Sequence, residues 1–176
     1  FYIKGSNDIV SIEYCMLMND DINKVFSIFK DYLHSLDEDK SCLIKHLVVR
    51  AIAHQILVGL IIKSDFDCSA FYTLLENNFS KIGLYKIINN RRDSVVLSGK
   101  TIHVSGIKEI VNNNFNLTYS VDLLGFQQTN IESQVIVYRK VLDLIKPNSV
   151  VINGFSGERL LSGILTSEAK HVYGRE

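Results

Sequence analysis

The chain has 176 residues, of which 47% are hydrophobic and 22% are charged, so it can bury a core as one domain or as a small domain with part of another. Its 19 basic and 19 acidic residues cancel, which excludes a global attraction to nucleic acid and leaves any RNA contact to a local patch or a further segment. The longest apolar run, ILVGLII at 56–62, is far below the roughly 20 residues that span a bilayer. Since no charged-then-apolar leader opens the chain, we expect a soluble, cytoplasmic protein with no membrane partner.

Residues 20–36 carry apolar side chains at three- and four-residue steps, which predicts a helix capped by Asn19 or Asp20. DEDKS at 37–41 predicts a loop. β-branched, apolar stretches then predict an antiparallel hairpin, a second helix and further short strands. These elements are the hairpin strands 43–50 and 54–63, the helix 69–79, and the strands 83–90, 94–98, 101–105 and 115–121.

The pattern changes after residue 121. Residues 131–145 predict a helix with one apolar face, capped by Thr129 or Asn130. PNS ends this helix. A β-α-β unit follows, with VVIN as its first strand, LLSGIL in its helix and HVYGRE as its second strand. Such a unit is typical of a doubly wound parallel sheet. We therefore predict an α+β domain over 1–121 and the first part of an α/β domain over 122–176.

The three cysteines, Cys15, Cys42 and Cys68, predict neither a disulfide framework nor a complete zinc site. Their number is odd and they form no CxxC pair. The five histidines form no HxxxH or HExxH pair. We expect no metal site that this chain completes alone.

The strand–turn–helix VVINGFSGERLLSGIL at 150–165 offers backbone N–H groups and a positive helix end to a ligand. Gly157 would let a ligand approach the chain closely. Glu176 ends the second strand, where such folds hold the two ribose hydroxyls of a nucleotide. The turn is not GxGxxG, however, because Arg159 stands where a glycine is expected. By spacing alone, a nucleotide site and an ordinary packed β-α-β unit remain alternatives.

Segments with recognisable motifs occur along nearly the whole chain. They are FYIKGSNDIVSIEYC at 1–15, LIKHLVVR at 43–50, GFQQTN at 125–130 before the tyrosine-bearing helix YRKVLDLI, and VVINGFSGERLLSGILTSEAKHVYGRE at 150–176. In this order they resemble motifs of the S-adenosylmethionine-dependent RNA uracil-C5 methyltransferases. The corresponding family patterns are G-F-x-x-x-S-x-x-I-V-x-I-x-x-C, L-R-H-L-V-x-R, FFQVN and VxDxYSGxGxLSxxLAxxAxxVxGxE.

The resemblance implies a fold and an activity. Family members have an RNA-binding β-barrel, a central α+β domain and a Rossmann-like methyltransferase domain, so this chain would hold the central domain and the first β-α-β part of the catalytic domain. The activity is methyl transfer from S-adenosylmethionine to C5 of uridine in ribosomal or transfer RNA. The family's nucleophilic cysteine and general base lie downstream of residue 176, so the resemblance assigns no catalytic residue here, and the isolated chain is expected to be inactive.

The resemblance also assigns cofactor and metal residues. Gln128, Phe155, Gly157 and Glu176 correspond to residues that contact S-adenosylmethionine. Cys15 corresponds to the last of four cysteines that hold a [4Fe–4S] cluster in many members, and such clusters need several thiolates. Each has an ordinary alternative: helix capping or loop solvation for Gln128, core packing for Phe155, and a buried small hydrophobe for Cys15.

Departures from the family patterns keep a second hypothesis open. Asn153 replaces an aspartate, Arg159 a glycine, Arg175 an apolar residue, and Leu160 a polar residue of some members. The chain could therefore be a non-catalytic RNA-binding or protein-docking module with a decayed cofactor loop. A methyltransferase acting on protein or a small molecule is a third option, which the central α+β domain disfavours.

Two groups of basic residues could present a face to RNA, although we favour an ordinary solvated sheet face. They are Lys45, His46 and Arg50 in one strand, and Arg91, Arg92 and Lys100 further on. The sequence leaves the oligomeric state open.

Overall fold

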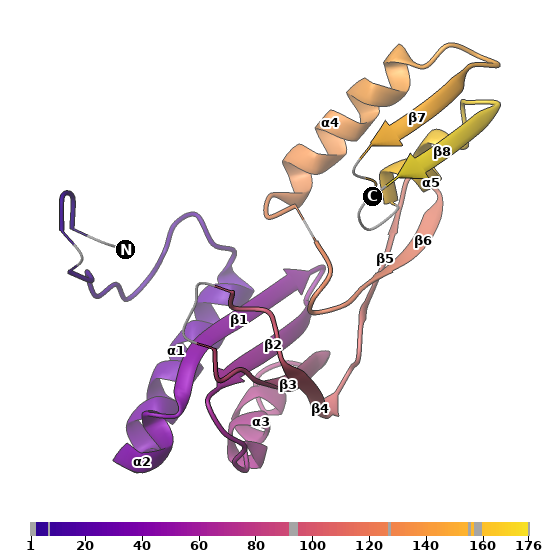
Figure 1. The fold of residues 1–176 in the computed structure, drawn as a ribbon. Helices are drawn as coiled ribbons and strands as arrows, with labels where there is room; N and C mark the ends of the chain where they lie inside the picture. Colours follow the sequence, from indigo (N-terminus) through magenta and orange to yellow (C-terminus); the bar gives the residue numbers. More distant parts are fainter. Residues whose placement is uncertain are drawn as a thin grey trace. The chain divides into compact units, whose positions relative to one another are not determined.

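A computed structural model describes residues 3–6, 8–91, 95–126, 128–154, 156 and 160–175 (Figure 1). Contacts divide the chain into two compact units, Phe1–Lys108 and Glu109–Glu176. This division falls before the hairpin that ends at residue 121, whereas the sequence prediction placed the domain boundary after it. Among the described residues, no helix is long and apolar enough to cross a membrane.

The first unit is a mixed sheet with helices on one face (Figure 1). The strand order is β1-β2-β3-β4, with β1–β2 antiparallel, β2–β3 parallel and β3–β4 antiparallel. The strands are β1 (Ile44–Ile52), β2 (Gln55–Ile62), β3 (Ile82–Ile88) and β4 (Lys100–Gly106), and the helices are α1 (Asp20–Ser35), α2 (Glu38–Ser41) and α3 (Ser69–Glu76).

The predicted helix α1 and the predicted hairpin β1–β2 are confirmed. Asn19 is the cap of α1, because its Oδ1 accepts the backbone N–H of Ile22 at 2.8 Å. Ala53 and His54 join the two strands with φ of 48° and 59°, the left-handed pair that a tight two-residue hairpin turn requires.

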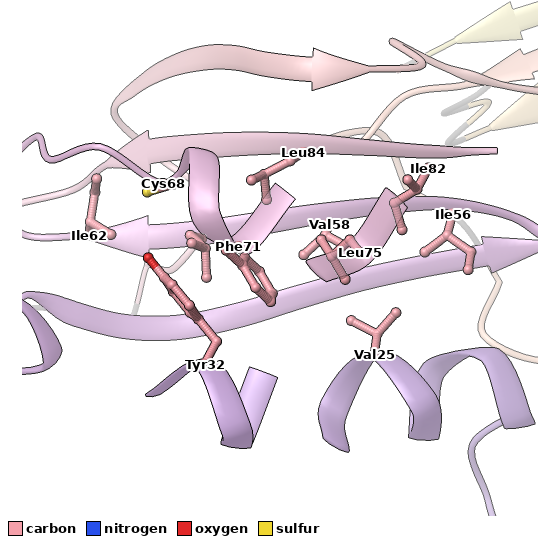
Figure 2. Close-up of a cluster of buried hydrophobic side chains, with 11 residues drawn as sticks. Val25, Tyr32, Ile56, Val58, Ile62, Cys68, Phe71, Leu75, Ile82 and Leu84 are labelled. Atoms are coloured by element: carbon pink, nitrogen blue, oxygen red, sulfur yellow. The ribbon is translucent and has the colours of Figure 1, made fainter. Parts of the chain in front are cut away.

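The core of this unit lies between α1, α3 and the sheet. Figure 2 shows Val25 and Tyr32 of α1 pointing toward Phe71 and Leu75 of α3 and toward side chains of the strands. The Phe71 ring is fully buried and stacks on Tyr32, with 4.8 Å between ring centroids. The aliphatic period-two pattern of β2 supplies the other side of this core.

The second unit contains two small sheets and two helices among its described residues. β5 (Ile110–Asn114) and β6 (Leu117–Val121) form an antiparallel hairpin, and β7 (Val150–Gly154) and β8 (His171–Arg175) pair in parallel. The helices are α4 (Ile131–Leu144) and α5 (Leu160–Leu165). The β7-α5-β8 order confirms the predicted β-α-β unit, and the described residues of the chain confirm the predicted α/β class.

One face of the β7–β8 pair is apolar and exposed. Val150, Ile152 and Tyr173 point away from α5 and are 59%, 75% and 60% exposed. In doubly wound sheets, helices cover both faces of such strands. Among the described residues, β7 and β8 therefore have the helix layer of this architecture on one face, formed by α5.

Two local predictions were wrong. DEDKS forms the short helix α2 instead of a loop, with the N–H of Cys42 donating to the carbonyl of Glu38 at 3.0 Å. Residues 95–98, the described part of the predicted strand SVVLS, are not a strand. Here the buried Asn89 side chain donates to the carbonyls of Val95 and Val96, at 2.8 and 3.0 Å, and so satisfies groups that a strand would pair.

Candidate cofactor site

The loop that follows β7 is tied to the end of β8. The N–H of Ser156 donates to the carbonyl of Arg175 at 3.0 Å, and Gly154 pairs with Arg175 in the parallel register. Because the carboxyl ends of parallel strands lie at one edge of the sheet, this edge brings Ser156 and the end of β8 together. It is the position at which doubly wound folds bind nucleotides.

Asn153, which replaces the aspartate of the family pattern, holds α5 to β7. Its Nδ2 donates to Oγ of Ser162 at 2.9 Å. Opposite it, a Cβ added at Gly174 would lie 3.0 Å from Oγ of Ser156 and 3.2 Å from Oγ of Ser162. The asparagine and the glycine therefore keep the first turn of α5 close to the end of the sheet.

A cavity of about 190 Å³ lies at the start of α4. It is lined by Gln128, Thr129, Asn130, Ser133, Gln134, Val137 and Tyr138. Asn130 caps the helix, since its Oδ1 accepts the N–H of Ser133 at 2.8 Å. Asn130, one of the two predicted caps, therefore occupies the capping role, and Gln128 is an exposed residue on the cavity wall.

Sequence reasoning did not single out Gln134 and Tyr138, which line this cavity. Gln134 is 7% exposed, and its Nε2 donates to the hydroxyl of Tyr138 at 3.1 Å. Both fall on the half-buried side of α4. The available signal was a glutamine at an inward position of an otherwise apolar helical face, because a buried amide needs polar partners.

The predicted cofactor residues Phe155, Gly157 and Glu176 lie outside the described residues. Their roles stay predictions, as does the effect of Arg159, which also lies outside them. Among the predicted cofactor residues, Gln128 is the one that the structure places, at the α4 cavity.

Cys15, the predicted cluster ligand, is buried at 8% exposure. The side chain of Asn23 holds its backbone: Oδ1 accepts the Cys15 N–H at 3.0 Å and Nδ2 donates to the Cys15 carbonyl at 3.0 Å. The described residues contain no group of three or more His, Cys, Asp or Glu side chains that could hold a metal ion. They therefore do not by themselves fit an iron–sulfur cluster, which needs several thiolates.

The environment of Cys68 disfavours a nucleophilic thiolate. The thiol is buried at the start of α3, and burial raises its pKa to about 11. A thiol with such a pKa is protonated at neutral pH and is a weak nucleophile. Cys42 is exposed and free.

Lys45, one of the residues in the proposed basic face, has a structural role. Its ammonium group donates to the carbonyls of Asn89 and Arg91, at 3.3 and 2.7 Å, and so holds the segment after β3. His46 is exposed on β1, whereas Arg92 lies outside the described residues. Lys45 is therefore not a free surface cation that could contact RNA.

The fold combines an α+β unit with a β-α-β part of Rossmann-like type. The tRNA (uracil-54, C5)-methyltransferase of Pyrococcus abyssi, solved with S-adenosyl-L-homocysteine, superimposes with a TM-score of 0.75 over 95% of this chain and 43% of that chain. The two sequences are 19% identical, so the likeness concerns the fold. No protein-family model matches the chain.

Curated relatives align with the entire chain. An uncharacterized RNA methyltransferase of Streptococcus agalactiae serotype V is 28% identical over 189 residues, covering 100% of this chain and 42% of that protein. Similar proteins, with the same description, occur in Enterococcus faecalis at 24% identity and in Caldanaerobacter subterraneus at 28%. The chain thus spans 41–42% of the length of these relatives.

Proposed function

We propose that this chain is part of an RNA methyltransferase that transfers a methyl group from S-adenosylmethionine to C5 of a uridine in ribosomal or transfer RNA. The similarity over the whole chain to proteins named RNA methyltransferases carries the proposal. The choice of uracil C5 rests on the ordered motifs. GFQQTN is the motif whose residue Gln128 lies at the α4 cavity.

In this proposal the chain contributes cofactor binding. Gln128 contacts the cofactor from the start of α4. Phe155 and Gly157 contact it from the loop after β7, and Glu176 binds its ribose at the end of β8. Asn153, through Ser162, keeps α5 in place behind this loop. When bound, S-adenosylmethionine supplies the electrophilic methyl group.

The chemistry requires residues beyond this chain. C5 of uracil is a poor nucleophile, so a cysteine thiolate first adds to C6 and gives an enolate that takes the methyl group at C5. A general base then removes the C5 proton, and the cysteine leaves as a thiolate. Cys68 does not suit the first step, because its thiol is buried with a raised pKa.

Tritium release from uridine tests the reaction. The full-length protein is incubated with S-adenosylmethionine and ribosomal or transfer RNA carrying tritium at uridine C5, with RNA tritiated at C6 as the matched control. C5 methylation releases tritium from the first RNA and none from the second. Methyl incorporation without tritium release would indicate another target atom, and no methyl incorporation into either RNA would contradict the proposal.

A further inference from the structure

Tyr138 presents a hydroxyl whose hydrogen is available to a ligand in the α4 cavity. The Gln134 amide donates to the tyrosine oxygen, so this oxygen is an acceptor in that bond and its own hydrogen points elsewhere. Both residues line the cavity. Since Gln134 is 7% exposed, its side chain is fixed in place and orients the tyrosine.

The β5–β6 hairpin holds the other side of the tyrosine ring. Phe115 and Asn116 form its turn with φ of 53° and 59°, and the Phe115 ring lies 6.2 Å from the Tyr138 ring between centroids. A phenylalanine in the left-handed region costs roughly 1 kcal/mol. Tyr138 is therefore positioned at both its ring and its hydroxyl before any ligand binds.

The cavity offers hydrogen-bond donors to a small acceptor group beside apolar surface. The side chains that line it are uncharged, and all of them except Val137 carry hydrogen-bonding groups. It opens at the start of a 14-residue helix, where the helix dipole and the first backbone N–H groups favour a negative charge. Glu132 is also in this first turn, but it is exposed and does not line the cavity. A carboxylate that accepts the Tyr138 hydrogen fits this lining.

We propose that Tyr138, oriented by Gln134, donates a hydrogen bond to the carboxylate of the methionine portion of S-adenosylmethionine. This inference rests on the proposed function and adds a binding residue to it. In this assignment Tyr138 binds the amino-acid portion of the cofactor, whereas the loop after β7 and the end of β8 bind its nucleoside.

Calorimetric titration with two ligands tests this assignment. S-adenosylhomocysteine carries the carboxylate, whereas 5′-methylthioadenosine keeps the nucleoside and sulfur and lacks the amino-acid portion. In the full-length protein, Tyr138→Phe is expected to weaken S-adenosylhomocysteine binding about tenfold or more, as for a lost hydrogen bond to a charged group. It should leave 5′-methylthioadenosine binding unchanged. Tyr119→Phe is the matched control, because the Tyr119 hydroxyl also accepts an amide hydrogen, from Asn112 at 2.9 Å.

The other results overturn the assignment in distinguishable ways. Equal S-adenosylhomocysteine affinity in Tyr138→Phe and wild type means that the hydroxyl does not contact the ligand, while the cofactor function stands. Equal weakening for both ligands means that Tyr138 only shapes the cavity. No S-adenosylhomocysteine binding by the wild type overturns the proposed function with it. If Tyr138→Phe does not fold, Gln134→Met should selectively weaken S-adenosylhomocysteine several-fold, and an unselective loss would contradict the assignment.

Discussion

Replacing Asn23 should release the segment that carries Cys15. The Asn23 side chain makes hydrogen bonds to the Cys15 N–H and carbonyl and to the carbonyls of Met18 and Asn19, at 3.0, 3.0, 3.2 and 3.3 Å. The residues after Cys15 give little other anchorage, because Met16 and Leu17 are 91% and 92% exposed. The amide of Asn23 therefore fixes the backbone of Cys15 and Met18 beside the start of α1.

The size of the effect follows from these bonds. Nδ2 has two hydrogens to share among three carbonyls, so the side chain makes the equivalent of three full bonds. At about 1 kcal/mol each, Asn23→Ala should favour local opening by about 3 kcal/mol, which is a factor of roughly 100 in the opening equilibrium. The higher helix propensity of alanine offsets only about 0.7 kcal/mol in α1.

Alkylation of Cys15, read by peptide mass spectrometry, measures this opening. The rate of Cys15 modification in Asn23→Ala should rise by one to two powers of ten over wild type, consistent with about 2–3 kcal/mol, while the exposed Cys42 reacts equally in both. Asn78→Ala is the control, since Asn78 is exposed and also donates to a backbone carbonyl. An unchanged Cys15 rate in Asn23→Ala would refute the reasoning.

Further predictions concern the first unit. Phe71→Ala should lower the free energy of unfolding, measured by urea denaturation, by about 3–5 kcal/mol. The control Leu74→Ala truncates a 40% exposed side chain and should lower it by less than about 1.5 kcal/mol. Equal losses in the two variants would contradict the core assignment. Burial raises the pKa of Cys68 to about 11 and that of Tyr32 to about 12. Both groups are buried in their neutral form. Their contribution to the stability of the folded state is therefore complete below about pH 9, and it is lost as the pH rises through their raised pKa values. Tyr32→Phe should therefore flatten the alkaline decline in melting temperature, and an unaltered pH profile would argue against it. Lys45→Met should speed amide exchange in the segment after β3, where two carbonyls lose their donor; unchanged exchange would show that Lys45 does not hold it.

Hydrophobic period and turn chemistry predicted the elements whose stability is local. α1 has a polar cap and an apolar stripe, and β1 and β2 are β-branched on both sides of a short gap. The parallel β7-α5-β8 unit followed from an apolar strand, a turn and a helix in sequence. The helix α1 and the β1–β2 hairpin satisfy their backbone through neighbours in the chain, so pattern and structure agree there.

Elements that depend on side-chain partners were not predictable in this way. β5 contains Asn112, Asn113 and Asn114, a residue type that is depleted in strands. Hydrogen bonds across the hairpin compensate: Asn112 donates to the Tyr119 hydroxyl at 2.9 Å, and Thr118 donates to Asn113 at 2.6 Å. The sequence does not reveal such pairings until the register is known.

One residue of the α4 cavity was singled out from the sequence, and its role in binding a cofactor stays a prediction. The motif GFQQTN identified Gln128, which lines the α4 cavity. Gln134 and Tyr138 were not identified, because the helical pattern assigns inward positions to packing and gives no sign that a buried amide orients a hydroxyl. The tight placement of Gly174 beside two serine hydroxyls is likewise a tertiary contact.

Titration of the full-length protein with S-adenosylhomocysteine tests the central claim most directly. Wild type, Gln128→Ala and, as a control in the first unit, Gln55→Ala are compared by calorimetry. The account predicts saturable binding to wild type and Gln55→Ala, and a loss of about tenfold or more in Gln128→Ala. Absence of binding to the wild type, or equal affinity in all three proteins, would contradict it.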